Sequence, residues 1–194
     1  VSCLLLLVLR QIKWFDQLQV NHRFSLRLWA TIGMLVLFVQ ITLGAWTSTN
    51  YAALACTDFP ACHGQYWPES NFDEAFKVWR GLGTNYEYGV LEASERRTIH
   101  LTHRLGAAVT VLILFDLLLV MWLSSSRKMW LLSLVLAVAL LLQVSIGIAI
   151  VLHKLPLPLA VAHNGGGALL LLALVMVNHA VWRADRITDD SSNE

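Results

Sequence analysis

Four long apolar stretches separated by polar segments dominate the chain, at about residues 28–46, 99–123, 130–152 and 157–182. Each is close to the length of about 20 residues that an α-helix needs to cross the hydrocarbon core of a bilayer. Backbone groups in that core must be hydrogen-bonded within the protein, which a helix achieves by itself. The pattern therefore predicts an all-α integral membrane four-helix bundle with a long loop at residues 48–97.

The composition supports a membrane protein. Charged residues make up 14% of the chain, whereas about a quarter is usual in soluble domains. The net charge is +1, which argues against the strongly basic surface of a nucleic-acid-binding protein. We therefore expect membrane lipid, and no nucleic acid, as the surrounding partner.

Lysine and arginine gather at one end of the apolar stretches, namely before the first, between the second and third, and after the fourth (Arg10, Lys13, Arg23, Arg27, Arg127, Lys128, Arg183 and Arg186). Positively charged loops remain on the cytoplasmic side. The pattern thus predicts that these three segments are cytoplasmic, including a tail at residues 184–194. It places the long loop and the turn at residues 153–156 on the opposite side.

The chain begins with a short apolar run at residues 1–9. This run is too short to span a bilayer and lacks the basic start of a signal peptide. We interpret residues 1–27 as the end of a preceding transmembrane helix followed by a cytoplasmic loop. On this interpretation the four-helix bundle comprises residues 28–183, within a longer protein.

An internal repeat relates the two halves of the bundle. The first and third stretches contain a glutamine followed four residues later by a glycine, and the second and fourth contain a histidine followed three residues later by a glycine (Gln40 and Gly44, Gln143 and Gly147, His103 and Gly106, His163 and Gly166). Both hairpins start on the cytoplasmic side, so the repeat is parallel, with a pseudo-two-fold axis along the membrane normal. The glycines predict close helix contacts.

The two repeated histidines are the main candidates for function, because ionisable residues within membrane helices are rare and usually functional. A pseudo-two-fold axis would bring His103 and His163 face to face, as two axial ligands of one haem iron require. Gly106 and Gly166 would leave room beside each imidazole for the porphyrin, since residues three apart are helix neighbours. The alternative is that both histidines hydrogen-bond between helices.

Two polar neighbours of His103 are further candidates. His100 lies one turn away and could gate the haem edge, relay a proton or bind a propionate; alternatively, it is an interfacial histidine in contact with water. Arg104 could bind a haem propionate, because guanidinium binds carboxylate through two hydrogen bonds, or form a salt bridge with an acidic residue of the long loop. Arg96 and Arg97 are candidates for the same propionate role.

The long loop contains Cys56 and Cys62. An oxidising compartment favours a disulfide between them, either structural or redox-active, and a zinc site with His63 is a further alternative. Residues 71–79 alternate acidic with aromatic side chains, which predicts a short amphipathic helix on the membrane surface. This loop would act as a lid over the haem site or be a plain packed loop.

Three motifs together resemble bacterial haem A synthase: Cys56-Thr-Asp-Phe-Pro-Ala-Cys62-His-Gly64, Ile99-His-Leu-Thr-His103-Arg104-Leu-Gly106 and Leu155-Pro-Leu-Pro-Leu-Ala-Val-Ala-His163-Asn. The resemblance extends over about residues 27–182. It implies a protein of two similar four-helix bundles that oxidises a methyl group of haem O to the formyl group of haem A, for terminal oxidase biogenesis. This chain is similar to the carboxy-terminal bundle, whose two axial haem b ligands match His103 and His163.

The chain departs from the amino-terminal bundle of that family, which has a Glu-x-x-His-Arg motif with a glutamate implicated in catalysis. The matching position here is His100, so the catalytic residues are unknown. The resemblance implies that this half binds haem b, with its iron, as an electron relay and is inactive alone. Substrate haem O would bind the remaining half, and the partners would include an electron donor, and haem O synthase or oxidase assembly factors.

The resemblance also implies a location in the bacterial inner membrane, with a periplasmic loop and a cytoplasmic tail. Two other functions remain open from the sequence. The chain could be a stand-alone cytochrome b that transfers electrons through a bis-histidine haem, or a non-catalytic membrane module that binds haem.

Overall fold

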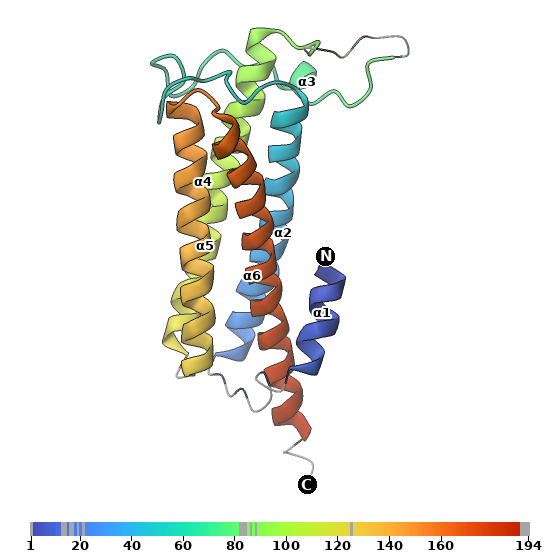
Figure 1. Cartoon of the computed structure of the whole chain (residues 1–194), viewed down its shortest axis with the longest axis vertical. Coiled ribbons are helices and arrows are strands. Elements are labelled where there is room, and N and C mark those ends of the chain that lie inside the picture. The colour runs from blue at the N-terminus through green and yellow to red at the C-terminus, as the bar shows by residue number, and fades with distance from the viewer. Residues whose placement is uncertain are drawn as a thin grey trace. The chain divides into compact units, whose positions relative to one another are not determined.

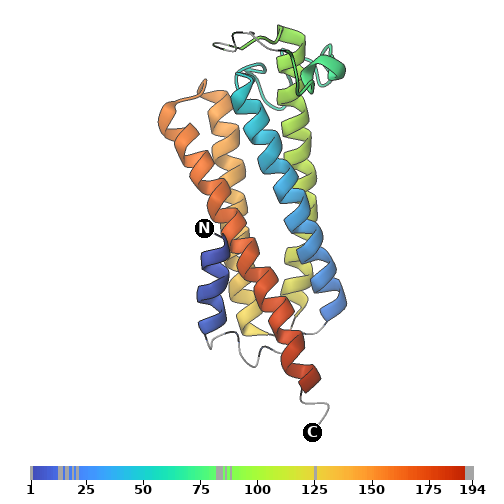
Figure 2. The same cartoon turned by 90° about the vertical axis from the view of Figure 1, so that its right-hand side faces the viewer.

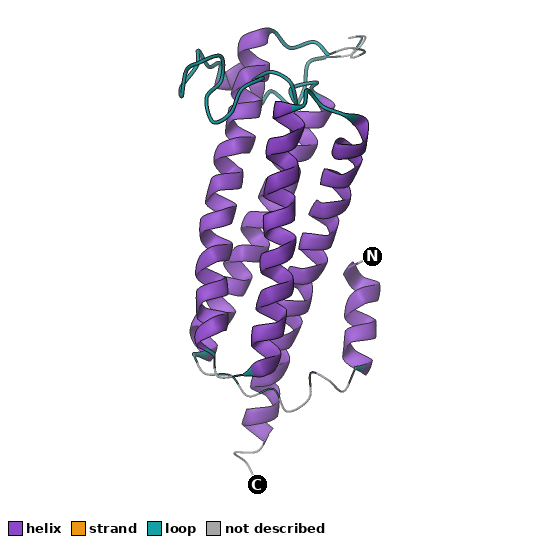
Figure 3. Cartoon of the chain, turned by 60° about the vertical axis from the view of Figure 1, so that its left-hand side comes forward, coloured by secondary structure: helices purple, strands orange, loops and turns teal. Residues whose placement is uncertain are grey.

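In a computed structural model, the described residues are 2–12, 15, 18, 20, 22–81, 85, 87, 89–124 and 126–190. This part of the chain consists of helices and connections and has no strand (Figure 3). The all-α fold predicted from the apolar pattern is therefore confirmed.

The helices, labelled in Figure 1, are α1 (Ser2–Gln11), α2 (Arg23–Thr49), α3 (Phe72–Ala75), α4 (Ala93–Leu123), α5 (Arg127–Leu152) and α6 (Leu157–Asp190). Among the described residues, four of them (α2, α4, α5 and α6) are long and apolar enough to cross a membrane. A turn joins α5 to α6, and a long connection that contains α3 joins α2 to α4 (Figures 1 and 2). Each predicted apolar stretch lies within one of these helices.

Two helices are longer than the apolar stretches that predicted them. Helix α4 begins at Ala93, six residues before the expected start. The backbone N–H of Glu92 donates a hydrogen bond to the Glu95 carboxylate, which is one half of a capping box and stabilises a polar first turn. Helix α6 continues to Asp190, into the segment that we expected to be a tail.

The chain forms two compact units, each with parts of the four long helices. The first comprises Val1–Leu37, Thr110–Gln143 and Asn164–Glu194, and the second comprises Phe38–Val109 and Val144–His163. In the first unit, α2 approaches α4 so closely that a Cβ on Gly33 would lie 2.9 Å from the Leu114 side chain. In the second unit, a core cluster ties the long connection to α4 (Ala52, Ala75, Leu91 and Ile99).

Large apolar side chains cover the outer faces of the long helices. Phe38 is 67% exposed and Leu141 is 68% exposed. Such surfaces are rare on soluble monomers, whereas lipid solvates them without cost because the hydrocarbon core is equally apolar. The exposed faces agree with a multi-pass membrane protein.

The helix predicted at residues 71–79 is much shorter, since α3 comprises Phe72–Ala75 alone. Asn71 caps its start by accepting a hydrogen bond from the Glu74 N–H. Its end is set by Trp46 of α2, whose Nε1 donates to the Ala75 carbonyl at 3.0 Å. That carbonyl would otherwise accept the next helical hydrogen bond, so a tertiary contact replaces the continuation of the helix.

Candidate functional site

His103 of α4 is held by two residues of α2. The amide Nε2 of Gln40 lies 3.1 Å from the ring Nδ1 of His103 and donates to the His103 carbonyl oxygen, also at 3.1 Å. One turn further along α2, a Cβ on Gly44 would lie 3.2 Å from Cε1 of the same ring. The imidazole thus occupies room that the absence of a side chain at Gly44 provides, and Gln40 fixes its Nδ1 edge.

His163 of α6 lies against α5 in the same manner. A Cβ on Gly147 would lie 3.0 Å from Cε1 of His163. Gly147 and Gly44 occupy the same position in the repeat, four residues after a glutamine. The contact of one imidazole with one glycine of the neighbouring helix therefore occurs twice.

Gly106 and Gly166 have a different neighbour from the one that we predicted. A Cβ on Gly106 would overlap Oε1 of Gln40, and a Cβ on Gly166 would overlap Oε1 of Gln143. The space beside both glycines is therefore taken by amide side chains from the partner helices, not left open beside the imidazoles. A contact of these glycines with a cofactor stays a prediction.

The two histidines belong to the same compact unit, and each is half-buried. The described residues contain no group of three or more histidine, cysteine, aspartate or glutamate side chains that could hold a metal ion. A haem iron needs only two axial ligands from the protein, because the macrocycle supplies the others. The donor set therefore fits a haem.

Arg104 binds the long connection through backbone oxygens. Its Nη1 donates to the Ala61 carbonyl at 2.9 Å, and its Nη2 donates to the carbonyls of Cys56 at 3.1 Å and Asp58 at 2.9 Å. The guanidinium also lies 5.8 Å from the ring centroid of Phe59. The structure thus gives Arg104 three carbonyl partners in place of the salt bridge that we considered. The propionate role stays a prediction.

His100 is only 4% exposed, so the interpretation as a histidine in contact with water is wrong. The backbone N–H of Cys56 points to its Nδ1 at 3.2 Å, and Nε of Arg104 lies 3.3 Å from its Nε2. A neutral imidazole accepts at one ring nitrogen only, so one of these two N–H groups at a time makes a full hydrogen bond. His100 and Arg104 together attach the connection to α4 beside His103.

Cys56 and Cys62 form a disulfide, as predicted, which excludes the zinc alternative for this state of the chain. The Asp58 carboxylate within this ring accepts hydrogen bonds from the backbone N–H groups of His63 at 2.6 Å and Gly64 at 2.9 Å. The hydrogen bonds from Gly64 and His63 hold the pKa of Asp58 below its ordinary value. The ring and the carboxylate together fix the backbone carbonyls that Arg104 binds. Whether the disulfide exchanges electrons stays a prediction.

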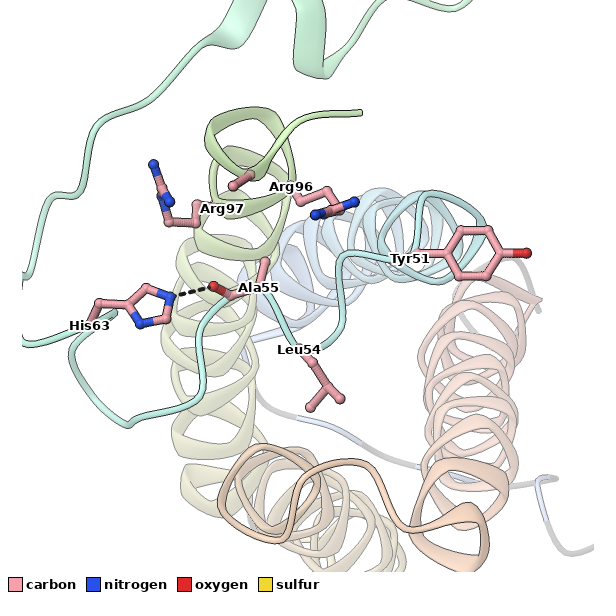
Figure 4. Close-up of a pocket in the computed structure, with 7 residues that line it drawn as sticks. Tyr51, Leu54, Ala55, His63, Arg96 and Arg97 are labelled. Carbon is pink, nitrogen blue, oxygen red and sulfur yellow. Dashed lines mark hydrogen bonds between the residues drawn. The ribbon is translucent and has the colours of Figure 1, made fainter. Parts of the chain in front are cut away.

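A cavity of about 320 Å³ lies at the start of α4 (Figure 4), lined by Tyr51, Leu54, Ala55, His63, Ala93, Arg96 and Arg97. Arg96 and Arg97 leave α4 on different sides, and Nε2 of His63 is within 2.9 Å of the Ala55 carbonyl. Arg97 also lies 3.9 Å from the Glu69 carboxylate. Neither His103 nor His163 lines this cavity, so a propionate role for Arg96 and Arg97 stays a prediction.

Comparisons with known proteins identify relatives of the chain. The family model COX15-CtaA, described as cytochrome oxidase assembly protein, matches residues 1–175. A haem A synthase from Shewanella oneidensis is 44% identical to the chain over 107 residues. That alignment covers 55% of this chain and 32% of the relative, so the matched part spans about a third of the relative's length.

Proposed function

Because the chain belongs to the COX15-CtaA family of cytochrome oxidase assembly proteins, we propose that it is the carboxy-terminal half of a haem A synthase and holds one haem b between His103 and His163. Family membership confirms the resemblance that we drew from the motifs. The assignment to one half of the protein, and the identity of the haem, are our own step beyond the family.

One observation carries this proposal. In each hairpin, an imidazole packs against a glycine of the neighbouring helix. A Cβ added to the glycine would lie 3.2 Å from Cε1 of the ring at Gly44 and 3.0 Å from it at Gly147. An interhelical hydrogen bond is also present in the first hairpin, between Gln40 and His103, so it is the recurrence of the glycine contact in both hairpins that favours a shared ligand. Two equivalent, half-buried imidazoles in one compact unit are the donor set that a bis-histidine haem takes.

The residues of the chain would each have a simple role. A haem bound here supplies one-electron transfer. His103 and His163 would hold the haem as its two protein ligands, so that no ligand position would remain for oxygen. Gln40 and Gly44 orient the His103 ring, and the exposed apolar faces of the helices keep the site within lipid. The bundle is thus suited to relay electrons, not to activate oxygen.

For the whole protein, we propose the oxidation of the haem O methyl group to the formyl group of haem A. Haem O would bind the remaining half, and an external donor would supply electrons. Haem O synthase and oxidase assembly factors are the expected partners, and the bacterial inner membrane is the expected location, with residues 48–97 in the periplasm. A stand-alone cytochrome b or a non-catalytic haem module would leave haem O unchanged in an assay of the full-length protein.

Pigment extraction from the purified full-length protein tests the haem assignment. We expect one haem b per chain that is lost in His103→Ala and in His163→Ala. His153→Ala is the matched control, because His153 lies exposed at the end of α5, and it should retain the haem. Full retention of haem b in both ligand variants would refute the proposed site.

A further inference from the structure

We propose that Gln40 is a positioning residue for His103: its amide selects the ring nitrogen that is presented for ligation and then sets the donor strength of the ligated imidazole. This inference rests on the proposed function in one respect, namely that His103 is an axial ligand. It gives Gln40 a role beyond the helix contact that the repeat predicts.

Two residues of α2 contact the His103 ring. Nε2 of Gln40 lies 3.1 Å from Nδ1 of His103, so this edge of the imidazole is engaged by α2. On the same helix, a Cβ on Gly44 would lie 3.2 Å from Cε1, 3.8 Å from Nδ1 and 3.9 Å from Nε2, so this glycine favours neither nitrogen. The contact with Gln40 is what distinguishes them, and it leaves Nε2 as the nitrogen for an external ligand.

The oxygen end of the Gln40 amide is in a different situation from its nitrogen end. Oε1 of Gln40 is buried and has no hydrogen-bond partner within the described part of the chain. A buried polar atom without a partner is unfavourable and calls for an explanation. A half-turn of the amide would exchange the two ends and place Oε1 against Nδ1, giving up the bond to the His103 carbonyl. Oε1 would then have a partner whenever Nδ1 carries a proton.

Ligation creates that situation. An imidazole that binds a metal through Nε2 carries its proton on Nδ1, and the hydrogen bond from this N–H fixes the tautomer. In the structure Gln40 presents a donor to Nδ1, which suits the opposite tautomer, with the proton on Nε2. By turning, an amide can form a hydrogen bond with Nδ1 in either tautomer of the ring. A leucine forms a hydrogen bond with neither tautomer, and a carboxylate only with the tautomer that ligates through Nε2.

The internal repeat contains the same glutamine–glycine contact in both hairpins. Gln143 overlies Gly166 in the second hairpin just as Gln40 overlies Gly106 in the first. Other neighbours of the two histidines differ, since Arg104 corresponds to Asn164 and His100 to Ala160. The glutamine thus recurs with the histidine and the glycines at the same spacing, and in the first hairpin it contacts the histidine ring.

A hydrogen bond from the ligating imidazole to an acceptor raises the basicity of the ligand. A more basic ligand stabilises ferric over ferrous iron and lowers the midpoint potential. In the haem-loaded full-length protein, Gln40→Glu should therefore lower the potential and Gln40→Leu should raise it, both with a retained six-coordinate spectrum. Val39→Leu, at an exposed apolar position of the same helix, is the control and should leave the potential unchanged.

Potentials that do not move, or that move in the same direction in both Gln40 variants, overturn the inference while the haem site stands. A second readout needs no haem. Nitrogen-15 spectra of the haem-free protein with labelled histidine should show the His103 proton on Nε2 in the wild type and on Nδ1 in Gln40→Glu. An unchanged tautomer in Gln40→Glu also overturns the inference. Retention of haem b in His103→Ala, by contrast, counts against the proposed function, and the tautomer measurement then still decides the role of Gln40.

Discussion

Each hairpin, α2 with α4 or α5 with α6, packs a histidine against a glycine of the neighbouring helix. The residues beside the two histidines differ. Arg104, next to His103, binds three carbonyls of the long connection. Asn164, next to His163, is exposed. The shared features are those that orient an imidazole, and the unshared features hold the connection. The comparison therefore separates the proposed ligand function from a loop-anchoring function.

The largest effect is expected where a side chain is added beside an imidazole. Valine at Gly44 or at Gly147 needs room that the ring occupies, because a Cβ alone would lie 3.2 Å or 3.0 Å from Cε1. Each variant should lose most of its six-coordinate haem, measured by absorption of the purified full-length protein. Gly165→Val is the matched control, since a Cβ at Gly165 meets nothing within 4 Å. Normal haem content in both Gly44→Val and Gly147→Val would show that the glycines do not seat the ligands.

Replacement of Arg104 should loosen the long connection, whereas replacement of the corresponding residue of the second hairpin should have little effect. Arg104→Met loses three charge-assisted hydrogen bonds to backbone carbonyls, of which each contributes about 1.5–3 kcal/mol. We expect much faster amide hydrogen exchange at residues 56–64, whereas Asn164→Ala should leave exchange around His163 nearly unchanged. Equal effects of the two substitutions would contradict the division of roles.

Loss of the disulfide should affect the connection and spare the ligands. Cys56→Ser with Cys62→Ser opens a ring of sequence separation 6, and closure of a ring of this size contributes about 2 kcal/mol in the chain-entropy description. Limited proteolysis should cut the double variant faster within residues 56–64, with the six-coordinate spectrum retained. Loss of the haem together with the disulfide would mean that the two functions are not separate.

Some of these structural features can be predicted from the sequence, and others cannot. The four membrane-length helices and the Cys56–Cys62 pair depend on local composition and spacing, and the structure bears them out. The contact of Gln40 with His103 and the carbonyl partners of Arg104 join residues that are far apart in the chain. A glutamine within an apolar stretch was the available signal for the first. A carbonyl carries no side-chain signature, so nothing in the sequence indicated the second.

The short helix α3 shows the same limit. Its amphipathic pattern is real, but Trp46 of α2 takes the Ala75 carbonyl. Glu74 accepts hydrogen bonds from Lys77 at 3.1 Å and Arg80 at 2.9 Å. One tertiary contact, from Trp46, and local hydrogen bonds to Glu74 therefore override the propensity for a longer helix.

The smallest expected effect is the pH dependence of the connection. Hydrogen bonds from Gly64 and His63 lower the pKa of Asp58 from its ordinary value of 3.8. A lowered pKa in the folded state contributes stability above the unfolded pKa, and this is lost as the pH falls through the folded value. Hydrogen exchange at His63 and Gly64 should therefore accelerate as the pH falls below about 3.8, after correction for intrinsic rates. Asp58→Asn should lack this acceleration, and an identical pH profile in that variant would exclude Asp58 as its source.

The central claim is that His103 and His163 are the axial pair of one haem. Low-temperature electron paramagnetic resonance of the oxidised full-length protein tests it most directly, with glycine placed at either position. We predict that a low-spin bis-imidazole signal disappears in His103→Gly and in His163→Gly and returns when free imidazole is added to each. A low-spin signal that persists unchanged in both variants would contradict the account.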